Sequence, residues 1–437
     1  MKKIFIFVLL ISTVLLGQKR VITLEECLAL GLQNSKEIEI SEAKLKISDS
    51  QVSEITAQML PGLSLEAGYT KLSDVPPFRV TVPFSPIPIQ IQETILNAYN
   101  LKLSVKQPLF TGFRLSSLRS ASKANFEANK LEFDQSRNDK AFAIYKTFWN
   151  YYKAQQGEGN LRETLNSLKN HLRDTENFVK SGLATQSDLL KLKVRIANLQ
   201  LSLIDADNAL LLAQNILNKE LGLPLNSETE IKATEPSVME SLPVYKELLS
   251  QALSKRNELK ALNLRIDAGK ENVTASNAGW YPQIFAYGDF YYSRPNQRIM
   301  PAEDIFNDTW DVGVGLQWNL WDWGSTSAKV TQAEQMLIQT EKNAELIKEA
   351  IQLEVHSNYL KMKSSLEKVT VGKLGVESAE ENYRITKVKY NQQLATSTEL
   401  IDAEVELYNA KTNLSTSLVD YELARIALEK SAAVKIY

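Results

Sequence analysis

Two long stretches of this chain, 109–223 and 302–437, contain no proline. Proline removes a backbone donor and clashes with the preceding helical turn. Its absence from sequence rich in Ala, Leu, Glu, Lys and Gln predicts helices far longer than the dozen or so residues usual in globular proteins. A helix over 114–180 would extend for about 100 Å, because each residue adds about 1.5 Å. Such lengths favour helical hairpins of the coiled-coil type.

A heptad pattern follows in each proline-free stretch, and it shows that the chain is duplicated. From Leu189 to Leu217, apolar residues recur at alternating steps of three and four, as in a coiled coil. The pattern returns 211 positions later, from Leu400 to Leu428, and is apolar except at Ser417. The segment LATQSDLL that begins at Leu183 also matches LATSTELI, which begins at Leu394. A repeat of this period determines the fold class.

The duplication predicts two structural repeats, 19–222 and 257–437, joined by a linker at 223–256. Each repeat is expected to contain a helix, two strands and a long helical hairpin. The strands are expected at about 62–72 and 99–110, then 283–294 and 309–320, and the hairpins at 114–221 and 325–431. Short turns at 181–185 and 392–396 should reverse the hairpins.

The first 18 residues are predicted to be a signal peptide. Lys2 and Lys3 precede an uncharged apolar run, 4–17, that is too short to span a bilayer. No later stretch approaches the length of a membrane-spanning helix. We therefore expect an exported chain that is periplasmic, extracellular or part of a β-barrel in an outer membrane.

The expected strands alternate apolar and polar residues. Strands of about ten residues with one apolar face suit a transmembrane barrel, and tryptophans near strand ends suit its interfaces. The alternative is a soluble antiparallel sheet, but the export signal and the duplication favour the membrane. Four strands cannot close a barrel alone, so the chain should oligomerise. The residues predicted to face lipid are Trp310, Val312, Val314, Leu316 and Trp318.

Composition excludes several classes of protein. Lys and Arg number 50 against 52 Asp and Glu, so the net charge of −2 does not fit a broadly basic nucleic-acid binder. One cysteine, Cys27, rules out a disulfide scaffold, and two histidines, His171 and His356, provide little for a metal centre. Neither a phosphate loop nor a nucleophile elbow is present. We predict no catalytic activity, no cofactor, no metal and no nucleic-acid partner. An exported enzyme on a helical scaffold and a coiled-coil envelope protein without a channel are the alternatives.

The order of these features resembles that of the TolC-like outer-membrane efflux protein family. The motifs are TLEECLALG at 23–31, GLAT at 182–185, Tyr390-Asn391, LIDAE at 400–404 and LYNAK at 407–411. The resemblance covers about 21–432 and implies a mainly α chain with a membrane β-barrel portion, assembled as a trimeric channel-tunnel. It implies a passive exit duct that crosses the outer membrane and extends into the periplasm. The implied partners are two further copies of the chain, outer-membrane lipid, a periplasmic adaptor and an inner-membrane transporter of RND or ABC type. The implied setting is a tripartite efflux pump or a type I secretion system.

The resemblance also assigns a periplasmic gate. Glu399 and Asp402, three residues apart on one helix face, match an acidic ring at the constriction; the alternative is carboxylates favoured by the helix dipole. Asp188 and Tyr390 match positions that link neighbouring hairpins and hold the aperture shut. The alternatives are a helix-start acid for Asp188 and a packed aromatic for Tyr390. Ala395 stands where the family has a gating arginine.

The two turns are the expected adaptor-docking tips. Gly182 permits the positive φ that a tight helix reversal needs, whereas Gln393 replaces glycine in the second turn. The proline-rich segment 73–98 is expected at the extracellular mouth, either as a constriction, as a site for an outside partner or as exposed filler. Cys27, His171 and His356 are expected to be structural or exposed. The tip residues are Gly182, Leu183 and Thr185 in the first turn, and Leu394 and Thr396 in the second.

Overall fold

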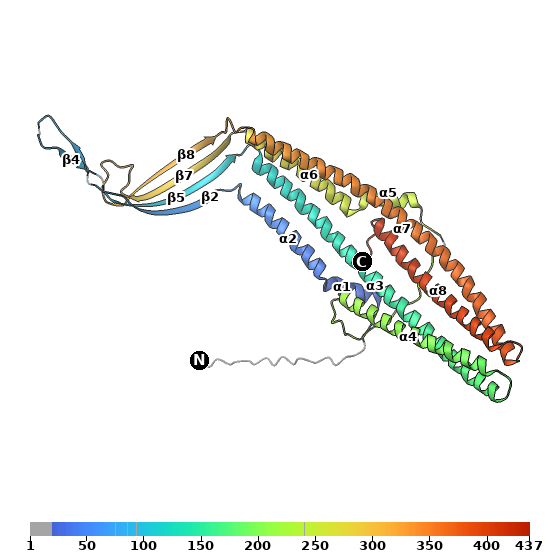
Figure 1. Cartoon of the computed structure of the whole chain (residues 1–437). Helices are drawn as coiled ribbons and strands as arrows, with labels where there is room; N and C mark the ends of the chain where they lie inside the picture. Colours follow the sequence, from blue (N-terminus) through green and yellow to red (C-terminus); the bar gives the residue numbers. More distant parts are fainter. Residues whose placement is uncertain (1–19, 75, 85, 93, 240) are drawn as a thin grey trace, which may run out of the picture. The chain divides into compact units, whose positions relative to one another are not determined.

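The computed structural model describes residues 20–437 except 75, 85, 93 and 240, so the predicted signal peptide at 1–18 lies outside the described residues. Helices dominate and strands are fewer, which confirms a mainly helical chain that also carries strands (Figure 1). Besides the long hairpins and the main sheet, the chain forms α1 (Leu24–Gln33), α2 (Lys36–Ala57), α5 (Tyr245–Lys255), α6 (Asn257–Asn277) and the short strands β1 (Arg20–Ile22), β3 (Phe78–Val80), β4 (Ile89–Gln92) and β6 (Thr229–Ile231).

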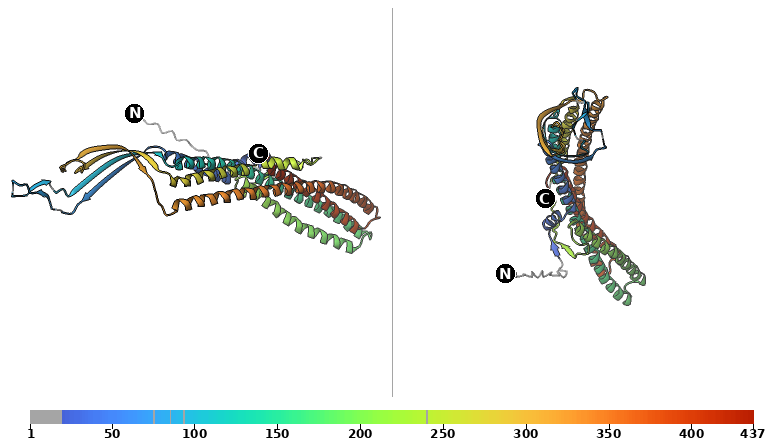
Figure 2. Two further views of the ribbon diagram at one scale, coloured as in Figure 1. Left: turned by 90° about the horizontal axis from the view of Figure 1, so that it is seen from above. Right: turned by 90° about the vertical axis from the view of Figure 1, so that its left-hand side faces the viewer.

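The two hairpins are equal in length. α3 (Arg114–Lys180) and α7 (Ser325–Asn391) each have 67 residues, and α4 (Gln186–Glu220) and α8 (Ser397–Ser431) each have 35. In the views of Figures 1 and 2, α3 runs beside α4 and α7 beside α8. None of the helices in the described part of the chain combines the length and the apolar composition needed to cross a lipid bilayer.

The chain divides into two compact units. The first contains 1–42, 132–259 and 347–437, and the second contains 43–131 and 260–346. The described part of the first unit holds both hairpin turns, and the second holds the main sheet. The long helices α3 and α7 contribute to both units because each crosses a boundary, at 131/132 and 346/347 respectively.

Five apolar clusters lie in the described part of the first unit, and the three largest follow the hairpin helices. One contains Ile144 and Phe148 of α3, Leu217 of α4 and Val419 of α8, and includes β1 and β6, which pair in parallel. A second runs along the predicted seam between α3 and α4 and includes Ile401 of α8. The third lies between α7 and α8, around the fully buried Tyr421. The heptad residues therefore form the contacts within each hairpin, as their spacing predicts.

The second unit contains a four-stranded antiparallel sheet in the order β2-β5-β7-β8. Each repeat contributes two adjacent strands, and the β5–β7 pairing joins the two repeats. A separate pair, β3 and β4, lies within the proline-rich segment between β2 and β5. The four strands of the sheet are β2 (Gly62–Lys71), β5 (Asn97–Phe110), β7 (Gln283–Arg294) and β8 (Asn307–Gln317).

Candidate functional site

The hairpin turns bring most of the predicted gate and docking residues together in the first unit. Gly182 adopts a φ of 76°, the left-handed conformation predicted for the reversal. Gln393 adopts a φ of 62° at the corresponding place in the second turn, although it is not glycine. Leu183 and Leu394 are exposed, so each turn presents an apolar side chain to solvent.

Both second helices begin with a reciprocal cap. Thr185 accepts a hydrogen bond from the Asp188 backbone N–H, and the Asp188 carboxylate accepts from the Thr185 N–H at 3.3 Å and from its hydroxyl at 2.6 Å. Thr396 and Glu399 form the same arrangement at the start of α8. Such boxes satisfy backbone donors that the first helical turn leaves unpaired. The cap explains why both threonines and both acids lie at these positions.

Glu399 and Asp402 are both exposed on α8. The Glu399 carboxylate accepts from the Thr396 backbone N–H at 2.6 Å and from its hydroxyl at 2.9 Å. These hydrogen bonds, the backbone one first, lower the pKa of Glu399, so the group stays negatively charged in mild acid. Glu399 therefore caps its helix and still carries a charge.

Tyr390 is buried between the two hairpins of one chain. It is 6% exposed, and its hydroxyl forms a hydrogen bond of 3.0 Å with the Thr175 hydroxyl on α3. Its ring packs edge-on against His171 and Phe178, also on α3. Burial raises the pKa of Tyr390 above its ordinary value. Tyr390 thus joins α7 to α3 within the chain, in the manner of a packed aromatic.

His171 belongs to the same contact, and the sequence pattern did not indicate this. The ring is 6% exposed and its Nε2 lies 3.2 Å from the Ser397 hydroxyl at the start of α8. Burial lowers the pKa of His171 to about 4, although the negative charge of Asp174 acts in the opposite direction. A single histidine on a helix with so many polar residues carries no periodic signal, because its burial depends on which helix lies opposite.

Glu404 is a second buried group that the pattern did not single out. It lies in α8 next to the heptad position Ala403 and is 5% exposed. Its desolvation raises the pKa of the carboxyl. Charged residues next to a heptad seam are usually solvated, so spacing alone gives no reason to expect this burial.

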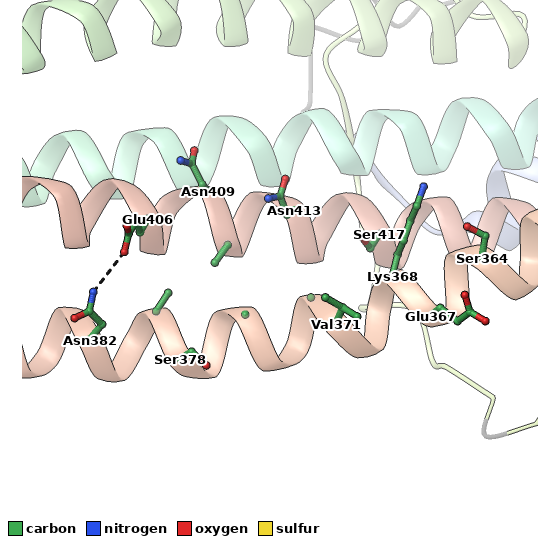
Figure 3. A pocket seen from close by; sticks show the side chains of 14 residues that line it. Ser364, Glu367, Lys368, Val371, Ser378, Asn382, Glu406, Asn409, Asn413 and Ser417 are labelled. Carbon is green, nitrogen blue, oxygen red and sulfur yellow. Dashed lines mark hydrogen bonds between the residues drawn. The ribbon is translucent and has the colours of Figure 1, made fainter.

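Figure 3 shows an open groove of about 840 Å³ between α7 and α8 in the first unit. Small side chains, among them Gly372, Gly375 and Ala410, line it, and a hydrogen bond of 3.4 Å joins Asn382 to Glu406 at one end. A Cβ at Gly372 would lie 3.4 Å from the Leu414 side chain, which is an ordinary van der Waals contact, so the approach of the two helices does not require glycine there. None of the predicted gate or docking residues lines this groove.

In the second unit, the predicted lipid-facing residues of β8 share one exposed face. Trp310, Val312, Val314 and Leu316 are all strongly exposed and alternate along the strand. The opposite face is polar: Lys102 of β5 pairs with Asp289 of β7 at 3.1 Å, and Arg298 pairs with Asp311 of β8. The sheet therefore has one apolar and one charged side.

Trp318 lies outside the strand in which it was expected. β8 ends at Gln317, and the Trp318 ring donates a hydrogen bond of 3.2 Å to the Trp280 carbonyl. The chain leaves the sheet here to enter α7, which begins at Ser325, and the Asp322 carboxylate accepts a hydrogen bond of 2.8 Å from the Thr326 backbone N–H in the first turn of that helix. The strand was predicted to end at 320, and this is wrong because β8 ends at Gln317.

The model of the outer membrane efflux protein family matches residues 28–223 and 248–434. Outer membrane protein TolC of Vibrio cholerae serotype O1 is 20% identical over 377 residues, which cover 85% of this chain and 82% of that protein. The alkaline protease secretion protein AprF of Pseudomonas aeruginosa is 22% identical over 350 residues, 77% of this chain and 70% of that protein.

A solved structure has the same fold. The outer membrane protein VceC from Vibrio cholerae superposes with a TM-score of 0.77 at 17% sequence identity, over 95% of this chain and 97% of that one. The family model alone matches most of the chain, in two segments whose gap, 224–247, lies within the predicted linker. The chain therefore belongs to the outer membrane efflux protein family.

Proposed function

We propose that this protein is the outer-membrane channel-tunnel of a tripartite efflux pump or a type I secretion system. It conducts substrates passively from the periplasmic side to the outside, and it has no catalytic role. The observation that carries the proposal is the sheet with one apolar and one charged face, in a chain of the outer membrane efflux protein family. An apolar face suits lipid and a charged face suits an aqueous lumen.

The edges of the sheet support assembly as a homotrimer. β2 and β8 each pair on one side only within the described residues, so each leaves a row of unpaired backbone groups. Lipid does not tolerate such edges, and a closed barrel removes them. Three copies of four strands make a barrel of twelve.

The first unit supports the same assembly through two exposed heptad rows. Along α4, exposed apolar residues are spaced by three, four or seven positions, and along α7 a similar row is spaced by three, seven or eleven positions. A seam of this kind buries its apolar side chains when another helix packs on it. We propose that α4 of one copy packs against α7 of the next. The α4 row contains Leu190, Val194, Leu201, Ile204 and Leu211, and the α7 row contains Leu353, Leu360, Val371 and Leu374.

The partners follow from the same proposal. The exposed turns, with Gly182, Leu183 and Thr185 in one and Leu394 and Thr396 in the other, would dock on a periplasmic adaptor. An inner-membrane transporter of RND or ABC type would supply the cargo. Two relatives are named as protease secretion proteins, AprF and PrtF of Dickeya chrysanthemi, which favours the type I secretion setting among the two.

The acidic pair at the start of α8 provides the test. In a trimer, Glu399 and Asp402 would place six carboxylates near one axis, with Asp188 and Tyr390 nearby in the turn region. Such a cluster attracts cations and binds multivalent ones more tightly. We expect planar-bilayer recordings to show cation-selective channels that periplasmic-side divalent or trivalent cations block.

The variant Glu399→Gln/Asp402→Asn removes the charge, while the amide oxygen introduced at position 399 can still accept the capping hydrogen bonds of Thr396. It should lose cation block and selectivity together and keep trimer assembly. Block unchanged from wild type would refute the ring, whereas a purified chain that forms no conducting pores would favour the coiled-coil envelope protein instead.

A further inference from the structure

A small cavity of about 80 Å³ lies inside the first unit, where the two hairpins of the chain meet. Its lining is rich in hydroxyl and amide groups, and its volume is sufficient to admit water. Three helices contribute: Asn160, Thr164 and Ser167 from α3, Tyr383 from α7, and Glu404 and Tyr408 from α8. A hydrogen bond of 3.2 Å between the Ser167 and Tyr383 hydroxyls connects α3 to α7 beside it.

Glu404 faces this cavity from a site that is almost closed to solvent. Its Oε1 has no hydrogen-bond partner among the described residues, and neither has the side-chain nitrogen of Asn160 across the same cavity. An ionised carboxylate in such a place is strongly disfavoured unless a cation or several donors pair with it. The neutral carboxylic acid is therefore the form that fits the packed hairpins.

None of the charged side chains around Glu404 in the described residues forms an ion pair with its carboxylate. Glu163 of α3 forms an ion pair of 3.5 Å with Lys411 of α8. On α7, the Lys387 ammonium lies 3.4 Å from the Tyr383 hydroxyl. On α4, the residues that pack near this part of α8 are apolar: Leu192, Ile196 and Leu199. Burial raises the pKa of Glu404, and the hydrogen bond from Ser167 and the charge of Lys387 oppose this only in part.

The internal duplication shows that packing alone does not require an acid here. The residue 211 positions before Glu404 is Lys193, on α4. Lys193 is exposed and pairs with Glu176 at 3.5 Å. The first hairpin therefore has a solvated base where the second hairpin has a buried acid, and only the acid faces the other hairpin.

We propose that Glu404 is a proton-binding site that latches the two hairpins of one chain together. With the proton bound, the neutral carboxyl donates a hydrogen bond inside the cavity, and α8 packs against α3 and α7. When the proton leaves, the carboxylate needs water around it, and α8 separates from α3 to admit that water.

The direction of the pH dependence follows from linkage. A carboxyl whose pKa is raised in the packed state stabilises that state fully below its ordinary value, near 4.3. The stabilisation is lost as the pH rises through the raised pKa. The latch should therefore be closed in acid and loosened towards neutral and higher pH. It concerns contacts within one chain and does not depend on channel activity.

Hydrogen exchange of the full chain in detergent tests the latch. At each pH, the exchange protection of amides in 400–410 is compared between wild type and Glu404→Gln, so that the intrinsic effect of pH on exchange cancels. Glutamine stays neutral, so wild-type protection relative to this variant should fall about tenfold per pH unit between the ordinary and the raised pKa. Glu406→Gln, an exposed acid on the same helix, should behave as wild type.

Equal pH dependence in wild type and Glu404→Gln would overturn the proposal. If the variant does not fold, infrared spectroscopy of the wild type decides the question instead. A protonated carboxyl band that persists above the ordinary glutamate range and disappears as protection falls supports the latch. Absence of such a band, or a band that disappears without any change in protection, refutes it.

Discussion

Glu399 shows how one side chain serves both structure and charge. Its carboxylate accepts two hydrogen bonds from Thr396, and this anchors the first turn of α8. The same hydrogen bonds lower its pKa, so they help to keep the charge that the proposed ring needs. The cap and the ring are therefore compatible, and Asp188 on α4 forms the same kind of cap.

The second turn is strained at Gln393. A φ of 62° brings Cβ close to the following carbonyl oxygen in any residue except glycine, which has no Cβ. Gln393→Gly should therefore raise the free energy of unfolding by about 1 kcal/mol, measured by denaturant titration of the helical signal. The neighbouring Gln392→Gly gains no such relief and should be neutral or destabilising. Equal effects at 392 and 393 would contradict the assignment of strain.

His171 contributes to the contact between the hairpins with the opposite pH dependence from Glu404, because the contribution of His171 is lost in acid. The pKa of His171 in the packed state, about 4, lies below the ordinary 6.5, so the neutral ring stabilises the packing above pH 6.5. That stabilisation is lost as the pH falls from 6.5 to 4, by roughly 3 kcal/mol in full. Exchange protection around Tyr390 and Ser397, compared at each pH with His171→Gln, should fall in acid for the wild type. If the ratio of exchange protection between wild type and His171→Gln does not change with pH, the His171 ring does not titrate in this pH range.

At the scale of elements, the sheet assigns its two faces by strict alternation. Residues 310, 312, 314 and 316 of β8 lie on the apolar face, and Thr309 and Asp311 lie on the other. The space beside the glycines that lie between them is occupied by other side chains. A Cβ at Gly315 would lie 2.5 Å from the Phe285 ring, and one at Gly313 would lie 2.7 Å from the Tyr287 hydroxyl. Aromatic rings of β7 therefore fill the space above these glycines.

An arginine on the apolar face should impair insertion into the membrane. Val314→Arg should cost roughly 2–4 kcal/mol if position 314 lies near the bilayer midplane, measured as reduced assembly in outer membranes. Thr309→Arg is the matched control, because it adds the same side chain to the polar face. Gly315→Arg is unsuitable, since it meets Phe285. Normal assembly of Val314→Arg would reverse the assignment of faces.

In the whole molecule, the exposed apolar surface supports the proposed assembly with further copies. The apolar rows of α4 and α7, the apolar face of the sheet and the two free strand edges are all unpartnered in the described part of one chain. Soluble monomers rarely expose contiguous apolar surface on this scale. Lipid and further copies of the chain are the partners that would cover it.

Disulfide trapping tests the proposed packing of α4 on α7 of the next copy. Leu201→Cys combined with Leu374→Cys joins the two exposed rows, and the native Cys27 is buried and should not react. Oxidation in membranes should produce covalent trimers. Leu199→Cys with Leu374→Cys is the control, because Leu199 packs inside its own hairpin. If oxidation yields no species larger than the monomer, the α4–α7 interface is wrong.

The helices, the strands and the duplication could be predicted from the sequence, because they follow from local periodicity. The proline-free stretches and the heptads from Leu189 and Leu400 predicted both hairpins, and the alternation around Val312 predicted the apolar face. Gly182 indicated the first turn, whereas nothing in Gln393 indicated a left-handed residue. Local patterns report what a residue does within its own element.

The polar groups that are buried between the hairpins could not be predicted from the sequence, because their burial depends on tertiary packing. Tyr390 and Glu404 come from the consecutive helices α7 and α8, whereas His171 comes from α3 in the other hairpin, and their burial depends on how α3 packs against α7 and α8. The same holds for Trp318, whose place past the end of β8 depends on where α7 begins. Heptad spacing specifies the seam within a hairpin but not the contact between two hairpins. For that reason the candidate proton site at Glu404 emerged from packing and not from sequence pattern.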